Sequence, residues 1–585
     1  MSFFEERREQ ALHEVATWAS VIRGGAKLTR EQLRYLGFGD DWDGWRLPLE
    51  GSGSVDLLLD GEFPYSIPRV ALVGRPDQLI APHVEKDGKL CLSGDNGRSD
   101  AMRPAEVAAY CYQEALSLVL ENEAGRNTDD FHLDFSAYWR RQLENAPAVW
   151  VWLGRDQSSR LVAAWHGQAF TLIAENEDDC QSWLNHRFGP KKERSVRSAL
   201  VVGLDALPSP SDYPVNGGKL RRLIAKSAPD SLAIFDRFVS SMSGNAVVVL
   251  GGKTLDGEPA WAPVIVSDGI SSSGGKSRAG ALRGFRTSRK PPALQVLDRG
   301  VKRASPTLVD AYISRLEGGL GEGLAAKRVV IFGCGSLGAG VAKILLQSGI
   351  RRMVLVDPEN LGWENIARHE LGGDSVGKAK ATELANRFTL MYPHVREILA
   401  TVDSWQSLAR RDPGVLTEAD LILSLIGDWN SEAALNDLQR APGGAITAPI
   451  LYGWLEEHAG AAHALAIGKA GSCFRCGFDT TGGATVPATK WTSKGPNVCG
   501  GATSVYGAVE LAPSQALVAS LAIDLLLGRA SAPVRRSWLA PRSTIGGLGG
   551  RINAAWESVY GDVECGGRMM AAPWPQKVDC SCSSP

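Results

Sequence analysis

The 585-residue chain has no run of eighteen apolar residues, the length that a membrane-spanning helix needs. Its first residues, MSFFEERREQ, lack the apolar segment of a signal peptide. Ten cysteines in so long a chain are too few for a disulfide scaffold and are typical of a reducing compartment. A formal net charge of −2 gives no general attraction to nucleic acid or anionic membranes. These absences predict a cytoplasmic protein that binds neither.

The most informative segment is KRVVIFGCGSLGAGVAKILLQSGIRRMVLVD, which begins at Lys327. An apolar strand leads into Gly333, Gly335 and Gly338, an apolar-faced helix follows, and a second strand ends at Asp357. Glycines permit a tight turn and a helix N-terminus favours phosphate, so the pattern predicts a nucleotide-binding βαβ unit. Asp357 suits a ribose hydroxyl. Up to this point NAD and ATP fit equally well.

The residues after Asp357 favour ATP. Asn365, Arg368 and Lys380 follow the second strand, and the strand LILSLIG ends at Asp428. Polar and cationic groups suit a triphosphate, and a carboxylate at a strand end suits Mg²⁺. A dehydrogenase has no need of them, which argues against an NAD-linked oxidoreductase.

This order of residues resembles the adenylation domain of ubiquitin-activating enzymes and of their molybdopterin- and thiamine-pathway relatives. The resemblance implies the following contacts to ATP and Mg²⁺: the ribose for Asp357, the phosphates for Asn365, Arg368 and Lys380, and Mg²⁺ for Asp428. Trp429 departs from the family, which usually has Asn at this position. Arg315, eighteen residues before Gly333, lies where the family has an arginine that reaches the partner subunit's ATP. The resemblance therefore also implies a homodimer.

Two pairs of cysteines lie far apart in the C-terminal part of the chain. The first is Cys473 with Cys476, and the second is Cys580 with Cys582. Two thiol pairs can complete a tetrahedral Zn²⁺ site that ties the C-terminus to the domain. The related enzymes have two such pairs at comparable places, although the second pair here is CxC rather than CxxC. The alternative is a cluster of reduced surface thiols.

Cys499 lies in a glycine-rich loop just before an apolar helix, within GPNVCGGATSVYGAVELAPSQ. Exposure and the helix dipole favour a reactive thiolate at such a place. In the family that the segment resembles, the cysteine before this helix accepts the activated acyl group, which makes Cys499 the candidate nucleophile. Cys565, in ECGG, is an alternative. A third possibility is that no cysteine accepts the group, because some relatives stop at the adenylate.

The N-terminal part contains VDLLLDGEFPYSIPRVALVG and, after it, APHVEKDGKLCLSGD, which places Cys91 in an extended stretch. Taken alone, Cys91 would be a buried structural thiol. The surrounding pattern resembles the core of ubiquitin-conjugating enzymes, in which the catalytic cysteine follows a His-Pro-Asn tripeptide by eight residues. His83 occupies the place of that Asn, and an imidazole N–H can donate to an oxyanion as a carboxamide does.

We therefore expect a multidomain α/β chain. The predicted domains are an α+β ubiquitin-conjugating-like domain over residues 1–145, an α/β linker domain over 146–300 and a Rossmann-like adenylation domain over 301–585. The linker domain has no recognisable site. Its end, SDGISSSGGKSRAGALRGFRTSRKPP, predicts a flexible basic loop because it is rich in Gly, Ser, Arg and Lys.

The order of a conjugating-like segment and then an activating-like segment resembles the fusion proteins of bacterial CBASS anti-phage operons. Those proteins attach the C-terminus of a cGAS-like nucleotidyltransferase to a target amine. The resemblance implies ATP-dependent activation of a protein C-terminus, a thioester relay through two cysteines and ligation to an amine. Related fusions occur in operons that encode ubiquitin-like proteins, and the motifs do not separate the two contexts. Further alternatives are an adenylating sulfur-carrier or cofactor-pathway enzyme and a scaffold with inactive sites.

Overall fold

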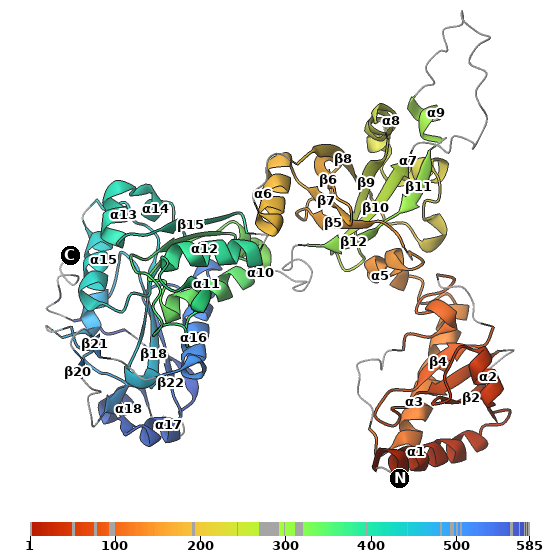
Figure 1. Ribbon diagram of the computed structural model, residues 1–585, viewed down its shortest axis with the longest axis horizontal. Helices are drawn as coiled ribbons and strands as arrows, with labels where there is room; N and C mark the ends of the chain where they lie inside the picture. The colour runs from red at the N-terminus through yellow and green to blue at the C-terminus, as the bar shows by residue number, and fades with distance from the viewer. Residues whose placement is uncertain are drawn as a thin grey trace, which may run out of the picture. The chain divides into compact units, whose positions relative to one another are not determined.

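The computed structural model describes most of the chain as helices and strands around several sheets (Figure 1), which confirms the predicted α/β class. It describes residues 3–49, 53–74, 79–92, 100–143, 145–189, 194–242, 244–267, 292–297, 299–309, 320–392, 395–441, 443–479, 482–491, 497–498, 501–502, 506–561, 566–572, 574–577, 580 and 582. Contacts group the chain into two units, Met1–Cys180 with Arg194–Thr307 and Gln181–Glu193 with Leu308–Pro585. The domain boundaries at residues 145 and 300 stay predictions.

The first unit begins with a four-stranded antiparallel sheet and its helices. The strands follow the order β1 (Ala26–Lys27), β2 (Asp43–Pro48), β3 (Ser54–Leu59) and β4 (Arg69–Leu72). The helices are α1 (Phe3–Ser20), α2 (Arg30–Tyr35) and α3 (Pro104–Glu123). Side chains alternate along a strand. Leu57 and Leu59 therefore join the core under α1 and α3, while Leu58 packs with Leu33 of α2.

The same unit contains an eight-stranded mixed sheet in the order β11-β10-β9-β8-β6-β7-β5-β12. Its strands are β5 (Ala148–Trp152), β6 (Arg160–His166), β7 (Phe170–Ala174), β8 (Val196–Gly203), β9 (Ala246–Lys253), β10 (Pro259–Ser267), β11 (Gly300–Arg303) and β12 (Ser305–Leu308). The remaining helices of this unit are α4 (Asp130–Leu133), α5 (Phe135–Arg140), α7 (Gly217–Ser227), α8 (Leu232–Ser241) and α9 (Pro292–Leu297). Helix α6 (Glu177–Phe188) begins in this unit, and its residues from Gln181 onward group with the second unit. Trp139 of α5 belongs to its core, and Trp139 Nε1 donates to Ala304 O at 3.1 Å. Residues 268–291, the predicted basic loop, lie outside the described residues.

The second unit is built on a sheet in the order β15-β14-β13-β16-β17-β18-β22-β24. The strands are β13 (Arg328–Phe332), β14 (Arg352–Val356), β15 (Glu397–Thr401), β16 (Leu421–Ser424), β17 (Ile450–Leu455), β18 (Ala461–Ile467), β22 (Val534–Leu539) and β24 (Arg568–Ala572). The strands from β15 to β17 in this order pair in parallel, and the pairings from β17 through β18 and β22 to β24 are antiparallel. Short pairs join β19 (Thr489–Trp491) to β23 (Gly550–Ile552) and β20 (Asn497–Val498) to β21 (Gly501–Ala502).

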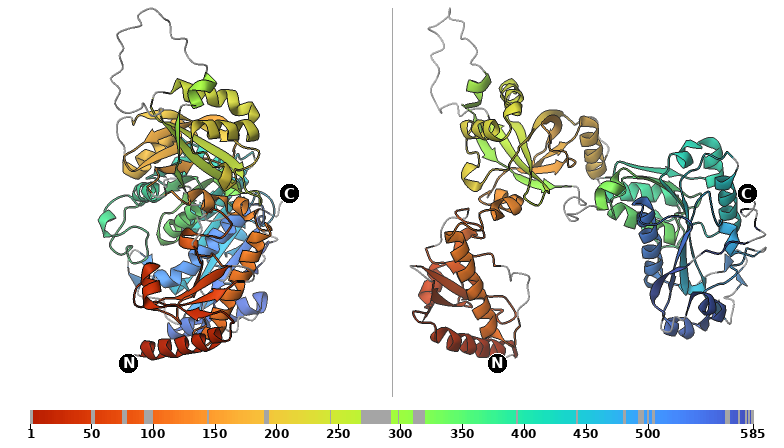
Figure 2. Two further views of the ribbon diagram at one scale, coloured as in Figure 1. Left: turned by 90° about the vertical axis from the view of Figure 1, so that its right-hand side faces the viewer. Right: turned by 180° about the vertical axis from the view of Figure 1, so that it is seen from behind.

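Helices cover both faces of this sheet, as Figures 1 and 2 show. The helices of this unit are α10 (Leu320–Ala325), α11 (Ser336–Gln347), α12 (Lys380–Met391), α13 (Trp405–Arg411), α14 (Gly414–Thr417), α15 (Trp429–Arg440), α16 (Ala508–Leu526), α17 (Arg542–Gly547) and α18 (Ala554–Tyr560). Val329 and Ile331 of β13 pack against α11, α12 and α16, whereas Val330 and Phe332 face α13, α14 and α15. Burial on both faces explains why the strand is apolar throughout.

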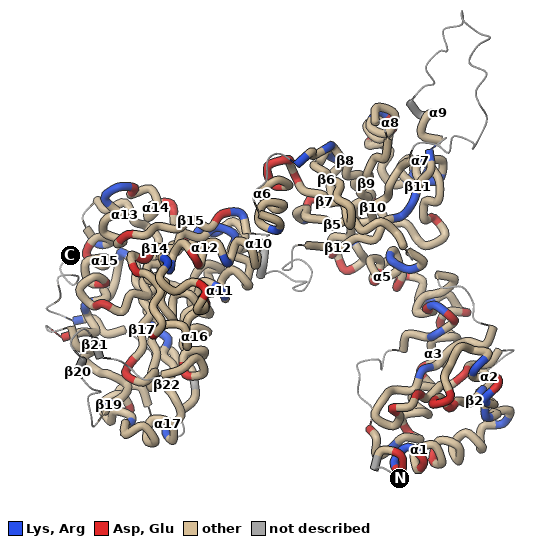
Figure 3. Tube along the Cα trace, in the orientation of Figure 1, with Lys and Arg blue, Asp and Glu red and all other residues tan. Residues whose placement is uncertain are grey.

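One described helix, α16, is long and apolar enough to cross a membrane by length and composition. Its side chains Leu517, Val518 and Leu521 are buried in the core of the second unit. The helix is therefore a core helix of that unit. Along the described trace Lys and Arg are interspersed with Asp and Glu (Figure 3), in line with the formal net charge of −2.

Candidate functional site

The predicted glycine turn joins β13 to α11. Gly333 has a φ of +89°, and a Cβ there would lie 2.6 Å from Leu425 O. A Cβ on Gly338 would lie 1.9 Å from Gly333 O, so only glycine permits this approach. Around Gly335, the N-cap of α11, no atom of the described residues beyond its chain neighbours lies within 4 Å of a Cβ position. The open space at a helix N-terminus suits an anion.

Asp357 follows β14 and is buried. Its Oδ2 accepts a hydrogen bond from Cys334 N at 2.6 Å, and its Oδ1 accepts one from Glu359 N at 2.8 Å. The carboxylate thus fixes the glycine turn, a role that the sequence reasoning missed. Each oxygen keeps a second lone pair, so the predicted ribose contact is compatible with this geometry and stays a prediction.

The predicted phosphate-binding residues lie in the segment that runs from Asp357 to α12. Lys380 is buried, and its Nζ donates to Glu359 Oε2 at 2.6 Å. The Arg368 guanidinium stands 4.6 Å from the centroid of the Tyr506 ring, and Asn365 Oδ1 accepts a hydrogen bond from Gly362 N. Glu359 thus connects two of the predicted residues, because its side chain binds Lys380 and its backbone N–H binds Asp357.

His369 is a further group of this site that the sequence reasoning missed. Its Nδ1 accepts a hydrogen bond from Leu371 N at 3.0 Å, and its Nε2 lies 2.7 Å from Cys334 O. Since a carbonyl can only accept, Nε2 carries the proton and donates. Burial lowers the pKa of His369, which favours this neutral form. His369 therefore stabilises the glycine turn together with Asp357.

Asp428 is exposed at the carboxyl end of β16, the strand next to β13. It caps α15, because its Oδ2 accepts a hydrogen bond from Ser431 N at 2.8 Å. Nearby Glu432 is buried and accepts a hydrogen bond from Ser424 Oγ at 3.1 Å. Burial raises the pKa of Glu432 to about 8, so this side chain is mostly protonated at neutral pH. Asp428 is the exposed carboxyl side chain at this strand end, and oxygen ligands of this kind suit Mg²⁺.

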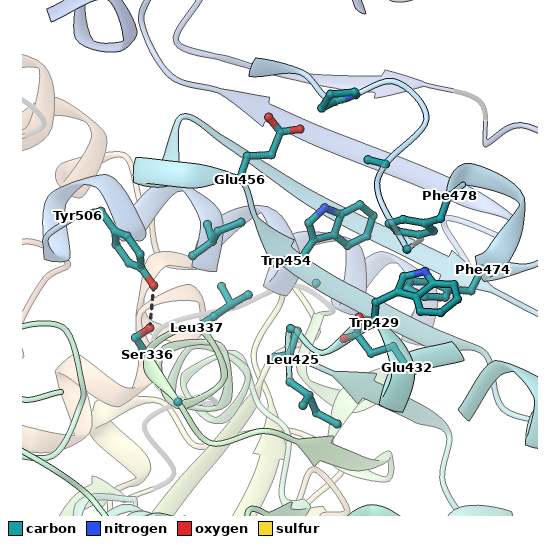
Figure 4. Close-up of a pocket in the computed structure, with 18 residues that line it drawn as sticks. Ser336, Leu337, Leu425, Trp429, Glu432, Trp454, Glu456, Phe474, Phe478 and Tyr506 are labelled. Carbon is teal, nitrogen blue, oxygen red and sulfur yellow. Dashed lines mark hydrogen bonds between the residues drawn. The ribbon is translucent and has the colours of Figure 1, made fainter. Parts of the chain in front are cut away.

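A cavity of about 490 Å³ opens between the start of α11 and β17 (Figure 4). Ser336 and Tyr506 form one side, where their hydroxyl oxygens are 3.4 Å apart. Trp429 lies with the aromatic rings of Phe474 and Phe478 on the other side. The residue that departs from the family pattern is thus part of the cavity wall. Ligands of open α/β sheets bind at such carboxyl ends of the strands.

The structure brings the four predicted cysteines of the second unit together. Their sulfur atoms all lie within 4.8 Å of one another, with 3.5 Å between Cys473 and Cys580 and 3.3 Å between Cys476 and Cys582. A tetrahedral Zn²⁺ with Zn–S bonds of about 2.3 Å places its sulfurs about 3.8 Å apart, so the donor set fits. Cys473 and Cys476 are buried, unlike a cluster of surface thiols.

Cys91 and His83 also lie together, in the first unit. Val84 and Leu90 form an antiparallel bridge, which lets Cys91 N donate to His83 O at 2.8 Å. His83 has a φ of +58° and donates its backbone N–H to Tyr138 Oη at 2.9 Å. Such left-handed residues cluster at functional sites. Both side chains line a cavity of about 320 Å³.

Two further residues of this cavity were missed by the sequence reasoning. Asp130 Oδ2 lies 3.0 Å from His83 Nε2. Asn127 is 8 % exposed, and neither of its side-chain amide atoms has a hydrogen-bond partner among the described residues. The signal in the sequence is the polar run RNTDD between α3 and the aromatic residues of α4 and α5. The site thus combines a thiol, an imidazole–carboxylate pair and an amide that has no partner in the described part of the chain.

Three predicted site residues, Arg315, Cys499 and Cys565, lie outside the described residues. Their roles stay predictions.

Comparisons with known proteins match two stretches of the chain to protein families. Residues 313–535 match the ThiF family and residues 44–147 match the prokaryotic E2 family B. The chain is 23 % identical over 439 residues to the ATP-dependent ubiquitin transferase-like protein Cap2 of Pseudomonas aeruginosa, covering 72 % of this chain and 75 % of that protein. Cap2 of Vibrio cholerae is 22 % identical over 421 residues, with coverage of 64 % and 68 %. The solved structure of E. coli MccB with ATP gives a TM-score of 0.32 at 18 % identity, covering 45 % of this chain and 68 % of that one.

Proposed function

We propose that this chain, which contains a ThiF domain and a prokaryotic E2 domain and is similar to Cap2 over most of its length, activates a protein C-terminus with ATP and conjugates it to an amine. The observation that carries the proposal is that one chain holds both a glycine turn with its polar segment and a cysteine pocket with an imidazole–carboxylate pair. An enzyme that only made an adenylate, such as a sulfur-carrier enzyme, would not need the second site.

Activation takes place at the glycine turn. ATP binds with its ribose at Asp357 and its phosphates near Arg368 and Lys380, and Asp428 would hold Mg²⁺, which offsets phosphate charge when bound. The terminal carboxylate of the modifier enters the cavity of about 490 Å³ and attacks the α-phosphate. Pyrophosphate leaves and an acyl-adenylate remains. Positioning of the carboxylate against the phosphate supplies much of the acceleration.

Transfer then proceeds through two thioesters. The Cys499 thiolate attacks the acyl-adenylate and AMP leaves, after which the Cys91 thiolate attacks that thioester and the Cys499 thiolate leaves. Finally, a target amine attacks the thioester on Cys91. The amide forms, and the Cys91 thiolate leaves.

The neighbours of Cys91 divide the work of the last step. When the His83 Nε2–H donates to Asp130, the Nδ1 atom is an acceptor that can take the proton from the amine. The Asn127 amide, which has no partner among the described residues, is then the better donor to the oxyanion. In this proposal His83 acts as a base, rather than as the oxyanion donor that the sequence suggested.

The proposal includes four further points. Cys473, Cys476, Cys580 and Cys582 would hold a structural Zn²⁺. The modifier is the C-terminus of a cGAS-like nucleotidyltransferase in bacterial anti-phage defence, with a ubiquitin-like protein as the alternative. The reaction takes place in the cytoplasm, where ATP is present and thiols stay reduced. The protein acts as a homodimer, in which Arg315 reaches the ATP of the partner subunit.

Activation is tested by the exchange of labelled pyrophosphate into ATP. The candidate modifiers in this assay are the proteins encoded next to the gene of this chain. Asp428→Asn keeps a side chain that caps α15 but removes the carboxylate, so it should abolish exchange without unfolding the protein. Ser404→Ala is the matched control, because Ser404 caps a different helix, α13. The protein with this substitution should keep full exchange. Undiminished exchange in Asp428→Asn would exclude Asp428 from the metal site. No exchange with any candidate modifier would contradict the proposed activation.

A further inference from the structure

A second cavity, of about 290 Å³, lies beside the cavity in which the modifier's carboxylate is expected. The two cavities share Trp454, Glu456 and Ala484 as wall residues. Trp454 and Glu456 are labelled in Figure 4 at the edge of the first cavity. The second cavity is therefore an immediate neighbour of the first.

The second cavity contains a buried arginine. Arg535, on β22, is 4 % exposed, and its Nε and Nη2 atoms have no hydrogen-bond acceptor among the described residues. Trp556 Nε1, in the same lining, has no acceptor there either. The guanidinium carbon lies 4.9 Å from the ring centroid of Trp556, 4.4 Å from that of Tyr560 and 5.3 Å from that of Trp574. The rings hold the guanidinium in place. Burial lowers the pKa of Arg535, and the Tyr560 hydroxyl and the charge of Glu456 partly offset this, while Nε and Nη2 stay without an acceptor among the described residues.

The other charged groups of this cavity already have partners. Glu456 accepts hydrogen bonds from Ala488 N and Thr489 N, each at 2.7 Å, and its Oε1 lies 3.0 Å from His463 Nε2. Lys577 Nζ donates to Phe478 O. Arg535 has no carboxylate within ion-pair distance among the described residues. A buried charge without a hydrogen-bonded partner is costly, so this cavity favours an anion.

We propose that this cavity binds the carboxylate side chain of an Asp or Glu located a few residues before the C-terminus of the modifier. The inference rests on the proposed activation of a protein C-terminus. The planar fork of Arg535 matches a carboxylate with two parallel hydrogen bonds, and Trp556 Nε1 supplies a third. The volume suits one side chain, and the aromatic walls exclude water, which strengthens the ion pair. Arg535 therefore acts as a specificity residue of the activation step.

The test uses acetylated ten-residue peptides that end in Gly and carry one Glu, moved through successive positions, with matched Gln peptides. Binding is measured by calorimetry without ATP. In one register we expect the Glu peptide to bind about 10- to 100-fold more tightly than the Gln peptide, the worth of a charged hydrogen bond. Arg535→Met, which keeps the apolar stem, should remove that preference. Arg536→Met is the matched control, since Arg536 pairs with Asp524 rather than lining the cavity.

Several outcomes decide the matter. Equal binding of Glu and Gln peptides to the unaltered protein at every position overturns the proposal. Free glutarate that competes through Arg535 as well as the best peptide would overturn the assignment to the modifier's tail. A Glu preference that depends on Arg535, without any pyrophosphate exchange, would keep the carboxylate site and contradict the activation step. If Arg535→Met fails to fold by circular dichroism, Trp556→Phe replaces it, because it removes one donor but keeps a ring, and it should weaken Glu binding alone.

Discussion

At the scale of single residues, the chemistry open to His83 depends on the atom that its ring already contacts. Asp130 Oδ2 lies 3.0 Å from Nε2, which leaves Nδ1 as the atom available to an incoming amine. In the proposed mechanism, His83, which stands in place of the Asn of the conjugating enzymes, accepts a proton. Asn127, from the segment after α3, would supply the carboxamide instead.

We predict that His83→Gln slows ligation to the amine but leaves the loading of Cys91 unchanged. A thiolate carries no proton to remove, whereas an amine does, and loss of a general base typically costs about 10²–10⁴ in rate. Asn127→Ala should slow both steps, because each passes through an oxyanion, by about 10²–10³. Single-turnover assays of Cys91 thioester and amide product measure the two steps.

His132→Ala is the matched control, because His132 contacts Ser209 Oγ and does not line the Cys91 cavity. It should ligate at the normal rate. Full ligation by His83→Gln would instead favour His83 as the oxyanion donor, because glutamine retains an amide N–H.

Residues of the candidate sites could be found from the sequence where a local motif contains them. They could not be found where folding brings distant segments together. The proximity of Cys91 and His83 could be predicted, because Cys91 follows His83 by eight positions in a recognisable run. Asp130 could not, because it reaches His83 across 47 residues and only folding brings the two together. Arg535 could not be predicted either, because only the folded structure shows that its Nε and Nη2 atoms lack an acceptor among the described residues.

At the scale of elements, the turn between β13 and α11 shows two different needs for glycine. Gly338 is required by the protein itself, since a Cβ would collide with Gly333 O. Gly335 has no such neighbour among the described atoms and has ordinary helix-entry dihedral angles, with φ at −73°. The spacing of the glycines was visible in the sequence, but this division of roles was not, because it depends on how strand and helix approach.

We predict that Gly335→Ala folds normally but binds ATP weakly, because the methyl group would occupy the space left for phosphate. Gly338→Ala should lower the thermal midpoint of unfolding as well. Differential scanning fluorimetry with and without ATP separates the two effects. Gly546→Ala, in α17, is the control, since it also has no atom within 4 Å of its Cβ position. Normal ATP binding by Gly335→Ala would place the phosphates elsewhere.

The cysteine cluster joins two distant segments of the second unit. Trp574 Nε1 donates to Cys473 O at 2.8 Å, and Asn436 Oδ1 accepts from Phe474 N at 2.9 Å. The cluster is thus linked to both α15 and the chain end. The CxxC pair and the CxC pair predicted the grouping, because closely spaced thiol pairs can share one metal.

We predict about one Zn²⁺ per chain by elemental analysis, and its removal by a chelator should lower the melting temperature and expose residues 574–577 to protease. Cys582→Ser should reproduce both effects. Cys180→Ala is the matched control, because Cys180 is buried outside the cluster, and it should retain its metal. Protein that contains no metal and is indifferent to the chelator would identify the four residues as ordinary thiols.

At the scale of the whole molecule, each of the two units has its own candidate site, and in the proposed mechanism an acyl group passes from one to the other. A thioester keeps the energy needed for amide formation, so each cysteine can act first as nucleophile and then as leaving group. In the proposed relay the thiol that attacks the adenylate is loaded first, and this sets the direction of transfer.

We predict that Cys499→Ala abolishes every thioester while pyrophosphate exchange continues, because the adenylate still forms. Cys91→Ala should instead accumulate a thioester on Cys499 and form no conjugate. Gels run with and without reductant distinguish the species, since thiols cleave thioesters but not the amide product. Cys111→Ala, which removes a buried thiol of the N-terminal core, is the control and should conjugate normally.

If Cys91 still loads in Cys499→Ala, the acceptor is either Cys565 or Cys91 itself, and the double variant Cys499→Ala, Cys565→Ala decides between them. Loading of Cys91 in that double variant would mean direct transfer from the adenylate and would contradict the relay.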